Sequence, residues 1–208
     1  MSDTAKREIR AFNFEVRAEQ TEEHGSTLTW RPIVFGSRTD MGWYDEIIEQ
    51  GALDSTDLKD VRFLVNHNTD MIPLARSRNN TDNSTMQMVV DEEGMKIRVD
   101  LDTENNAEAK ALYSAVERND ISGMSFMFNV DKDSWDDIDT EHPLRHIRSI
   151  SKVFEVSAVT FPAYEATSIQ TRGLTGALDG AAESLESVKA EIRKVELQKL
   201  KVKILSEV

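Results

Sequence analysis

The chain contains no cysteine. This absence excludes cysteine nucleophiles, disulfide bonds and thiolate zinc sites, and it favours a reducing compartment such as the cytosol. No apolar run approaches the roughly 20 residues that a membrane-spanning helix needs. The N-terminal segment also lacks the apolar core of a signal peptide. We therefore expect an intracellular protein with no membrane partner.

Basic residues are scarce relative to acidic ones. The sequence has 25 Lys and Arg against 38 Asp and Glu, which gives a formal net charge of -13. A nucleic-acid-binding protein needs a basic surface to neutralise phosphates, so we expect no nucleic-acid partner. The 39% hydrophobic and 30% charged content is typical of a folded globular protein. A length of 208 residues allows one domain and an appendage.

Signatures of cofactor and metal sites are also missing. The sequence has no glycine-rich phosphate-binding loop. His142 and His146 have the spacing of zinc ligands on one helical face, but Pro143 lies between them and no glutamate follows His142 to act as a base. We therefore interpret residues 131–146 as a polar loop and expect neither a metal ion nor a cofactor.

Most of the remaining pattern predicts strands. Residues 8–20 and 28–33 predict two strands that are joined near Gly25, and apolar alternation continues in 61–67 and through 73–101. Two short helices are expected between these strands. One begins at Met41 and ends near Gly51, and the other begins at the N-cap Thr103 and closes near Asn119.

The last third of the sequence predicts two further strands and a tail. ISGMSFMF ends at Phe128, and the strand at 152–161 is apolar on both faces, which is typical of a central strand. The small residues of 173–184 predict a linker, and an amphipathic helix is expected from Leu185. The predicted organisation is an α+β domain over residues 1–172, followed by a linker and helix over 173–208.

Three polar residues interrupt these apolar strands: His67, Ser125 and Glu155. Polar groups are costly to bury unless they are partnered. A histidine, a serine and a carboxylate are the parts of a nucleophilic hydrolase, in which an imidazole activates a hydroxyl and an acid orients the imidazole. Mutual partnering would satisfy all three.

Each residue also has a structural explanation. A histidine at a strand end is more often structural than catalytic, and Glu155 could form a buried salt bridge with Arg145 or Arg148. Ser122 and Ser157 are rival nucleophiles. Ser125 is favoured because the adjacent Gly123 permits close approach of another backbone. The residues alone leave these alternatives open.

The span from about residue 8 to 172 resembles the prohead (procapsid) maturation proteases of tailed bacteriophages. The resemblance rests on EIIEQGAL, VRFLVNHN followed by PLAR, MKIRVDL, ISGMSFMF and FEVSAVTFPAYEAT, in that order. It implies a fold similar to the herpesvirus protease assemblin, an antiparallel β-barrel-like core flanked by helices. It also implies that His67 is the base, Ser125 the nucleophile and Glu155 the third member of a catalytic triad.

The same resemblance implies partners and a place of action. The expected substrate is a scaffold protein or the scaffold domain of a coat protein, cleaved together with the chain itself inside an assembling procapsid in the host cytoplasm. The major capsid protein is an expected partner, and a homodimer is possible by analogy with assemblin. Two alternatives remain: an inactive assembly factor with the same fold, and an unrelated esterase, although SGMSF lacks the Gly-x-Ser-x-Gly turn.

Overall fold

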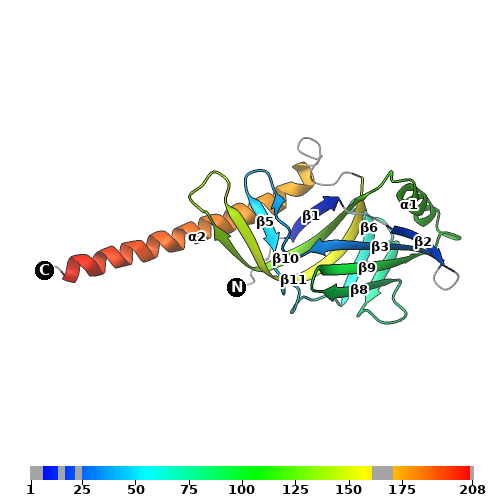
Figure 1. Ribbon diagram of the computed structural model, residues 1–208, viewed down its shortest axis with the longest axis horizontal. Helices are drawn as coiled ribbons and strands as arrows, with labels where there is room; N and C mark the ends of the chain where they lie inside the picture. The colour runs from blue at the N-terminus through cyan, green and yellow to red at the C-terminus, as the bar shows by residue number, and fades with distance from the viewer. Residues whose placement is uncertain (1–6, 14–16, 22–24, 161–170, 207–208) are drawn as a thin grey trace.

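Two β-sheets form the body of the protein, and a long C-terminal helix extends from it (Figure 1). The computed structural model describes residues 7–13, 17–21, 25–160 and 171–206. The first sheet has seven strands: β1 (Arg7–Asn13), β4 (Thr39–Asp40), β5 (Asp45–Ile48), β6 (Asp60–Val65), β7 (Ala75–Arg78), β10 (Gly123–Asp136) and β11 (Leu144–Val159). The second has four: β2 (Arg17–Thr21), β3 (Gly25–Val34), β8 (Met86–Asp91) and β9 (Gly94–Leu101).

The two long strands β10 and β11 organise the first sheet. They form an antiparallel hairpin, with β1 paired to the free side of β10. Strands β5 and β6 both pair in parallel with β11, β5 along its first part and β6 along its last part. Strand β11 is therefore central, as its two apolar faces predicted.

The hydrophobic core lies between the two sheets. Trp30 of β3 packs against Phe63 of β6 with ring centroids 5.6 Å apart. Helix α1 (Ala107–Glu117) adds Ala109, Leu112 and Val116 to the same core. The predicted α+β class is therefore confirmed at the level of a mixed fold, mostly strands with a C-terminal helix. The predicted barrel-like core is not confirmed, because the described strands form two separate sheets and no closed barrel.

The helix expected between Met41 and Gly51 is absent. This segment instead contains β5 and a turn at Gly51, where φ is +85°. The spacing of Trp43, Ile47 and Ile48 fits a helical stripe, but the burial alternates along β5 because this strand pairs with β11. Tertiary pairing thus overrides a short periodic pattern.

Helix α1 begins later than predicted. Its N-cap is Asn106, whose side chain accepts hydrogen bonds from the backbone N–H groups of Glu108 and Ala109. The Thr103 hydroxyl is instead 2.7 Å from the Ser26 hydroxyl on β3. The predicted end is confirmed: Asn119 has φ of +61°, the left-handed conformation that commonly closes helices.

The loop predicted at 131–146 is largely the end of the β10–β11 hairpin, with 137–143 between the strands. Two of its acidic residues have partners on β11: Asp133 accepts a hydrogen bond from Arg145 at 2.7 Å, and Asp136 is 3.1 Å from His146. Cross-strand ion pairs therefore allow a polar sequence to form strands.

A β-bulge at Phe154 changes which residues of β11 face the core. Glu155 pairs with Met127, and the next paired residue is Val153, which lies opposite Phe128. Strict alternation would place Val153 on the same face as Glu155, but Val153 is fully buried in the core. Bulges of this kind re-aim side chains next to functional sites.

A buried ion network lies where β1, β5 and the β10–β11 hairpin meet. Arg10 donates to Glu8 and Glu46, and Arg145 donates to Glu8 at 2.8 and 3.0 Å. Burial disfavours the charged form of Glu8, yet Arg10 and Arg145 hold the pKa of this carboxyl below its ordinary value. Each charge is therefore compensated by opposite charges at hydrogen-bond distance.

Helix α2 (Thr171–Ser206) runs through the segment predicted as a linker, so that prediction is wrong. Ala181 and Leu185 pack in a second apolar cluster with Tyr44 and Trp135. Ser184 fastens the helix to the hairpin, since it accepts a hydrogen bond from Trp135 Nε1 at 3.1 Å and donates to Asp133. The small residues thus permit close helix packing rather than flexibility.

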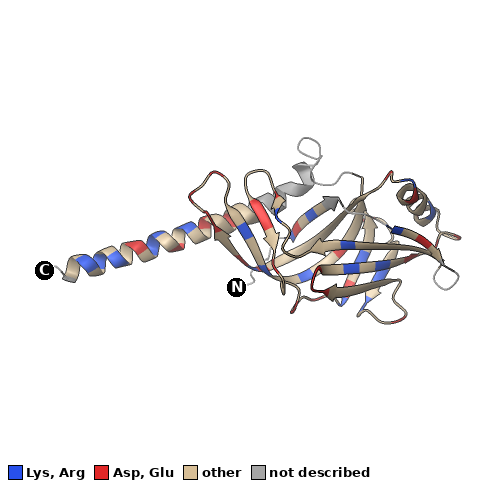
Figure 2. Cartoon of the chain, in the orientation of Figure 1, with Lys and Arg blue, Asp and Glu red and all other residues tan. Residues whose placement is uncertain are grey.

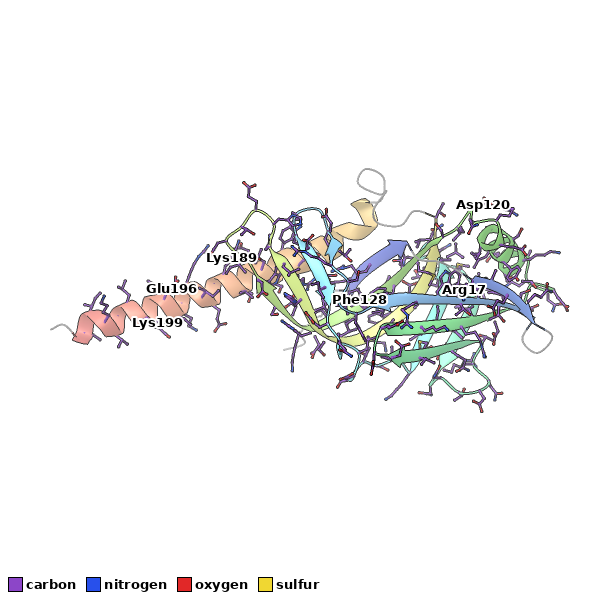
Figure 3. The ribbon with its side chains drawn as sticks, in the orientation of Figure 1. Arg17, Asp120, Phe128, Lys189, Glu196 and Lys199 are labelled. Atoms are coloured by element: carbon purple, nitrogen blue, oxygen red, sulfur yellow. The ribbon has the colours of Figure 1, made fainter. Side chains whose placement is uncertain are left out.

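Beyond this contact α2 projects away from the body, and Figure 3 labels Lys189, Glu196 and Lys199 along the projecting half. Both basic and acidic residues lie along this half (Figure 2). Its exposed apolar residues are Ile192, Val195, Leu197, Leu200, Val202, Ile204 and Leu205. A tail helix was predicted here, and the division into a domain of 1–172 and a tail of 173–208 stays a prediction.

Candidate active site

One face of the seven-stranded sheet carries the polar residues of interest. Ser125 of β10 lies opposite Ser157 of β11, and Glu155 lies two residues before Ser157. Residues opposite one another or two apart on a strand share a face, so these three point to the same side. The intervening residues Phe126 and Val156 point to the core. Strand periodicity alone therefore places Ser125, Ser157 and the Glu155 carboxylate on one face of the sheet.

His67 reaches this face from the turn after β6. Asn66 and His67 both have left-handed backbones, with φ of +50° and +56°, a conformation that costs non-glycine residues about 1–2 kcal/mol each. The turn is fastened to β11: the Asn66 N–H donates to the carbonyl of Ala158 at 2.9 Å, and the Thr160 N–H donates to Asn66 Oδ1 at 3.0 Å. His67 therefore lies in a strained, anchored turn rather than on the strand itself.

His67 and Glu155 form a direct hydrogen bond. Nδ1 of the imidazole is 2.6 Å from Oε1 of Glu155, and the carboxylate is 3% exposed. Nε2 of His67 has no hydrogen-bond partner among the described residues. An imidazole held at Nδ1 by a carboxylate, with Nε2 free, is arranged to accept a proton at Nε2.

The arginine alternatives for Glu155 fail. Arg145 pairs with Glu8, Glu46 and Asp133, and Arg148 donates to Ser134 and contacts Glu49. The carboxylate of Glu155 is instead shared by His67 and Ser157. Ser157 donates its hydroxyl hydrogen to Glu155 Oε2 at 2.5 Å and accepts the backbone N–H of His67 at 3.2 Å.

Ser125 is fully buried, at 0% exposure. Its hydroxyl donates to the carbonyl oxygen of Arg10 on β1 at 2.7 Å. The structure therefore places Ser125 on the same sheet face as Glu155, while its hydrogen bond runs to the backbone of β1 rather than to the imidazole. Transfer of the Ser125 proton to His67 requires the hydroxyl to exchange this acceptor.

A cavity of about 300 Å³ lies beside Glu155 on the same face. Five apolar side chains from β6, β10, β11 and the loop after His67 line it, with two arginines and one threonine. The lining residues are Arg7, Arg62, Leu64, Thr69, Met71, Pro73, Met127, Phe154 and Glu155. Because its volume is comparable to that of small ligand sites, the cavity can hold a side chain of a bound peptide.

Sequence reasoning missed the supporting residues. Ser157 was considered only as a rival nucleophile, and the pairing of Asn66 with Thr160 was not considered. The signal available for Ser157 is its position: a serine two residues from a buried glutamate, on the same face of an otherwise apolar strand, can bond to that glutamate.

The other histidines lie in acidic surroundings. His142 Nε2 is 2.9 Å from Asp45 Oδ1, and Asp40 belongs to the same group of possible ligands. The guanidinium of Arg38 also donates a hydrogen bond to Asp45, so this carboxylate already has a positively charged partner. His146 contacts Glu49 at 2.5 Å and Asp136. These contacts explain both histidines as hydrogen-bond partners of carboxylates.

Comparison with known proteins agrees with the sequence resemblance. Within the described residues no helix is long and apolar enough to cross a membrane. No curated protein matches the chain. Among solved structures, the bacteriophage T4 capsid assembly protease gp21 is similar, with 10% identity, a TM-score of 0.40, and coverage of 74% of this chain and 97% of that chain. The sequence profile of the caudovirus prohead serine proteases matches residues 12–178. The chain belongs to the caudovirus prohead serine protease family.

Proposed function

We propose that this protein is a serine endopeptidase that cleaves capsid scaffold, and itself, inside the procapsid during head maturation. The observation that carries the proposal is the hydrogen bond between His67 Nδ1 and Glu155 Oε1, on the sheet face that also bears Ser125. Membership of the prohead serine protease family supports the same reaction class.

The proposed reaction is acyl transfer to water. His67 Nε2 takes the proton from the Ser125 hydroxyl, whose oxygen attacks the peptide carbonyl and forms an acyl-enzyme. Glu155 keeps the proton on Nδ1 and stabilises the imidazolium that forms. The imidazolium then protonates the leaving amine, and a water molecule deprotonated by His67 releases the acyl group and restores Ser125.

Ser125 must change its hydrogen bond for this step. Its hydroxyl now donates to the Arg10 carbonyl, and the proposed attack requires it to give up this acceptor for the imidazole. The arrangement described here is therefore the resting state of the proposed enzyme, and the exchange precedes the attack.

The scaffold cleavage assay tests the proposal directly. The chain is coexpressed with the cognate coat and scaffold proteins, and wild type is compared with Ser125→Ala and His67→Ala. Both variants should abolish processing. The matched control is Ser122→Ala, because Ser122 is an exposed serine three residues away. Normal processing by Ser125→Ala would overturn the assignment of the nucleophile.

The second candidate is an inactive assembly factor with the same fold. The complete burial of Ser125 and its bond to Arg10 favour this alternative. A fluorophosphonate probe separates the two, since it reacts covalently with an activated serine. Labelling of wild type that maps to Ser125 supports the enzyme, and unlabelled protein that still promotes capsid assembly supports the assembly factor.

Self-cleavage is tested on the purified wild type by mass spectrometry. The backbone over 173–184 is helical, so this segment does not offer the flexible chain that proteases cleave most readily. A cleaved product of wild type that is absent from Ser125→Ala would support self-processing. An intact chain after long incubation with assembled procapsids would contradict it.

A further inference from the structure

The polar contacts around Glu155 form a closed ring. His67 Nδ1 lies 2.6 Å from Glu155 Oε1, Ser157 donates to Glu155 Oε2 at 2.5 Å, and the backbone N–H of His67 donates to Ser157 Oγ at 3.2 Å. The ring thus links the imidazole of His67 to the backbone of His67 through Glu155 and Ser157.

This ring constrains the carboxylate in a way that a single hydrogen bond does not. The terminal torsion of a glutamate is broad, so a carboxylate that is held at one oxygen can still turn. Ser157 holds the second oxygen, and Ser157 is itself fixed by the backbone of His67. The side chains of Glu155 and Ser157 are buried, at 3% and 0% exposure, so water does not replace the Ser157 hydroxyl at the carboxylate.

The ring also anchors the imidazole. The left-handed turn at Asn66 and His67 is a strained arrangement that needs outside contacts to persist. The Ser157 hydroxyl supplies one of them, since it accepts the N–H of His67. A single hydroxyl therefore fixes both the orienting acid and the backbone of the base.

We propose that Ser157 is a positioning residue of the active site, acting through Glu155 on His67. This inference rests on the proposed triad and adds a fourth residue to it. Ser157 lies opposite Ser125 on the neighbouring strand, so one cross-strand pair supplies the proposed nucleophile and the residue that aligns its base. Ser157 itself touches neither the substrate nor the reacting atoms.

The contacts of Ser157 also argue against a role as nucleophile. Its proton is donated to Glu155, and its oxygen accepts the His67 N–H. To act as the nucleophile, Ser157 would have to give its proton to the imidazole and so break its bond to the acid that orients this imidazole. The two roles make opposite predictions for probe labelling: Ser157→Ala keeps a slow reaction at Ser125 if Ser157 positions the acid, and loses all reaction if Ser157 is the nucleophile.

The kinetic test uses the full chain and three substitutions. Ser157→Ala removes the hydroxyl, Ser157→Cys keeps the shape with a weak donor, and Ser157→Thr restores a hydroxyl at the cost of one methyl group. Loss of a hydrogen bond to a charged group should lower kcat of scaffold cleavage about 10- to 100-fold in the Ala and Cys variants, with KM within about twofold. Ser157→Thr should recover most of the loss in molecules that fold.

A spectroscopic readout reports on the base directly. The proton between His67 Nδ1 and Glu155 Oε1 should give a low-field NMR resonance in protein labelled with 15N-histidine, assigned by its absence from His67→Gln. In Ser157→Ala and Ser157→Cys this resonance should broaden or move upfield, because the carboxylate is no longer fixed. Ser157→Thr should retain it.

The outcomes separate the two proposals. If wild type fails to label at Ser125, the proposed function fails, while the NMR resonance still tests the ring. If wild type labels at Ser125 but the Ala and Cys variants keep both the wild-type kcat and the resonance, the positioning role is overturned. Equal loss of activity in all three variants with an unchanged resonance would also overturn it, because a packing defect would then explain the loss.

Discussion

Substitution of Arg145 by methionine should destabilise the fold severely, although Arg145 lies outside the proposed triad. Arg145 is 2% exposed and donates to three carboxylates. Two of these, Glu8 and Glu46, are themselves buried. The network contains two guanidinium groups and three carboxylates, so loss of Arg145 leaves Arg10 to compensate all three negative charges.

The size of the effect follows from burial. Breaking a buried ion pair by removing one partner costs about 3–5 kcal/mol, because an uncompensated charge remains in a medium of low polarity. A domain is stable by only about 5–15 kcal/mol. With a urea m-value near the upper end of the usual range, about 2–3 kcal/mol per molar, the midpoint should fall by roughly 1–2 M.

Urea unfolding followed by tryptophan fluorescence measures this shift, since Trp135 lies beside Arg145 at 5.8 Å from guanidinium carbon to ring centroid. The matched control is Arg148→Met, three residues along the same strand. Arg148 is 49% exposed and contacts Ser134 and Glu49, so its loss should cost less than about 1 kcal/mol. A midpoint for Arg145→Met equal to that of Arg148→Met would refute the argument from burial.

Three further predictions concern the site, the pH dependence and the tail. Glu155→Gln should lower kcat about 10²- to 10⁴-fold in scaffold cleavage, less than Ser125→Ala, because the imidazole loses its anionic acceptor. The pKa of Glu8 is lowered in the folded protein, so its ionised form stabilises the fold above the ordinary value of 4.5, and this stabilisation is lost as the pH falls below that value. The urea midpoint should therefore decrease as the pH is lowered below about 4.5, and it should decrease less steeply in Glu8→Gln. Leu185→Ala should speed amide hydrogen exchange in the first half of α2 while the exposed control Leu200→Ala leaves it unchanged.

The residues that share a sheet face at the site could be predicted from the sequence, because side chains alternate between the two faces of a strand. In ISGMSFMF the alternation separates Ser125 from the core residues Phe126 and Phe128, and the structure keeps that separation. The contact between Glu155 and His67 could be anticipated only as a requirement of chemistry, since 88 residues separate them. Their strands meet because β6 joins β11 in parallel.

The bulge at Phe154 could not be predicted from the alternation of apolar residues in the sequence. It inserts one residue into β11 and brings Val153 and Val156 to the same core. A bulge leaves no reliable mark in a single sequence, because any residue can occupy it and its effect depends on the partner strand. Glu155 and Ser157 therefore share one face and Val156 and Ala158 the other, as strict alternation expects, whereas Val153 departs from it.

The buried ion network was missed for a related reason. The first strand was predicted from apolar alternation, yet two of its charged residues, Glu8 and Arg10, are buried. Charged residues are interpreted as exposed unless a partner is known, and apart from the Glu8–Arg10 pair the partners here lie 36 to 137 positions away. Only the tertiary fold brings those partners together.

In the β10–β11 hairpin, one half of the strand pair carries the stabilising ion network and the other half carries the proposed site. Toward the hairpin end, Asp133 and Arg145 hold the ion network beneath α2, and toward the other end Ser125 and Ser157 support the proposed site. The two halves meet at Arg10, whose side chain belongs to the network and whose backbone carbonyl accepts the Ser125 hydroxyl. Strand β1 therefore contributes to both, because the side chain and the backbone of one residue point to different neighbours. The resting position of the proposed nucleophile consequently depends on how β1 is held, and β1 is held in part by Arg145, which binds Glu8 and also Asp133, the acceptor of the Ser184 hydroxyl on α2.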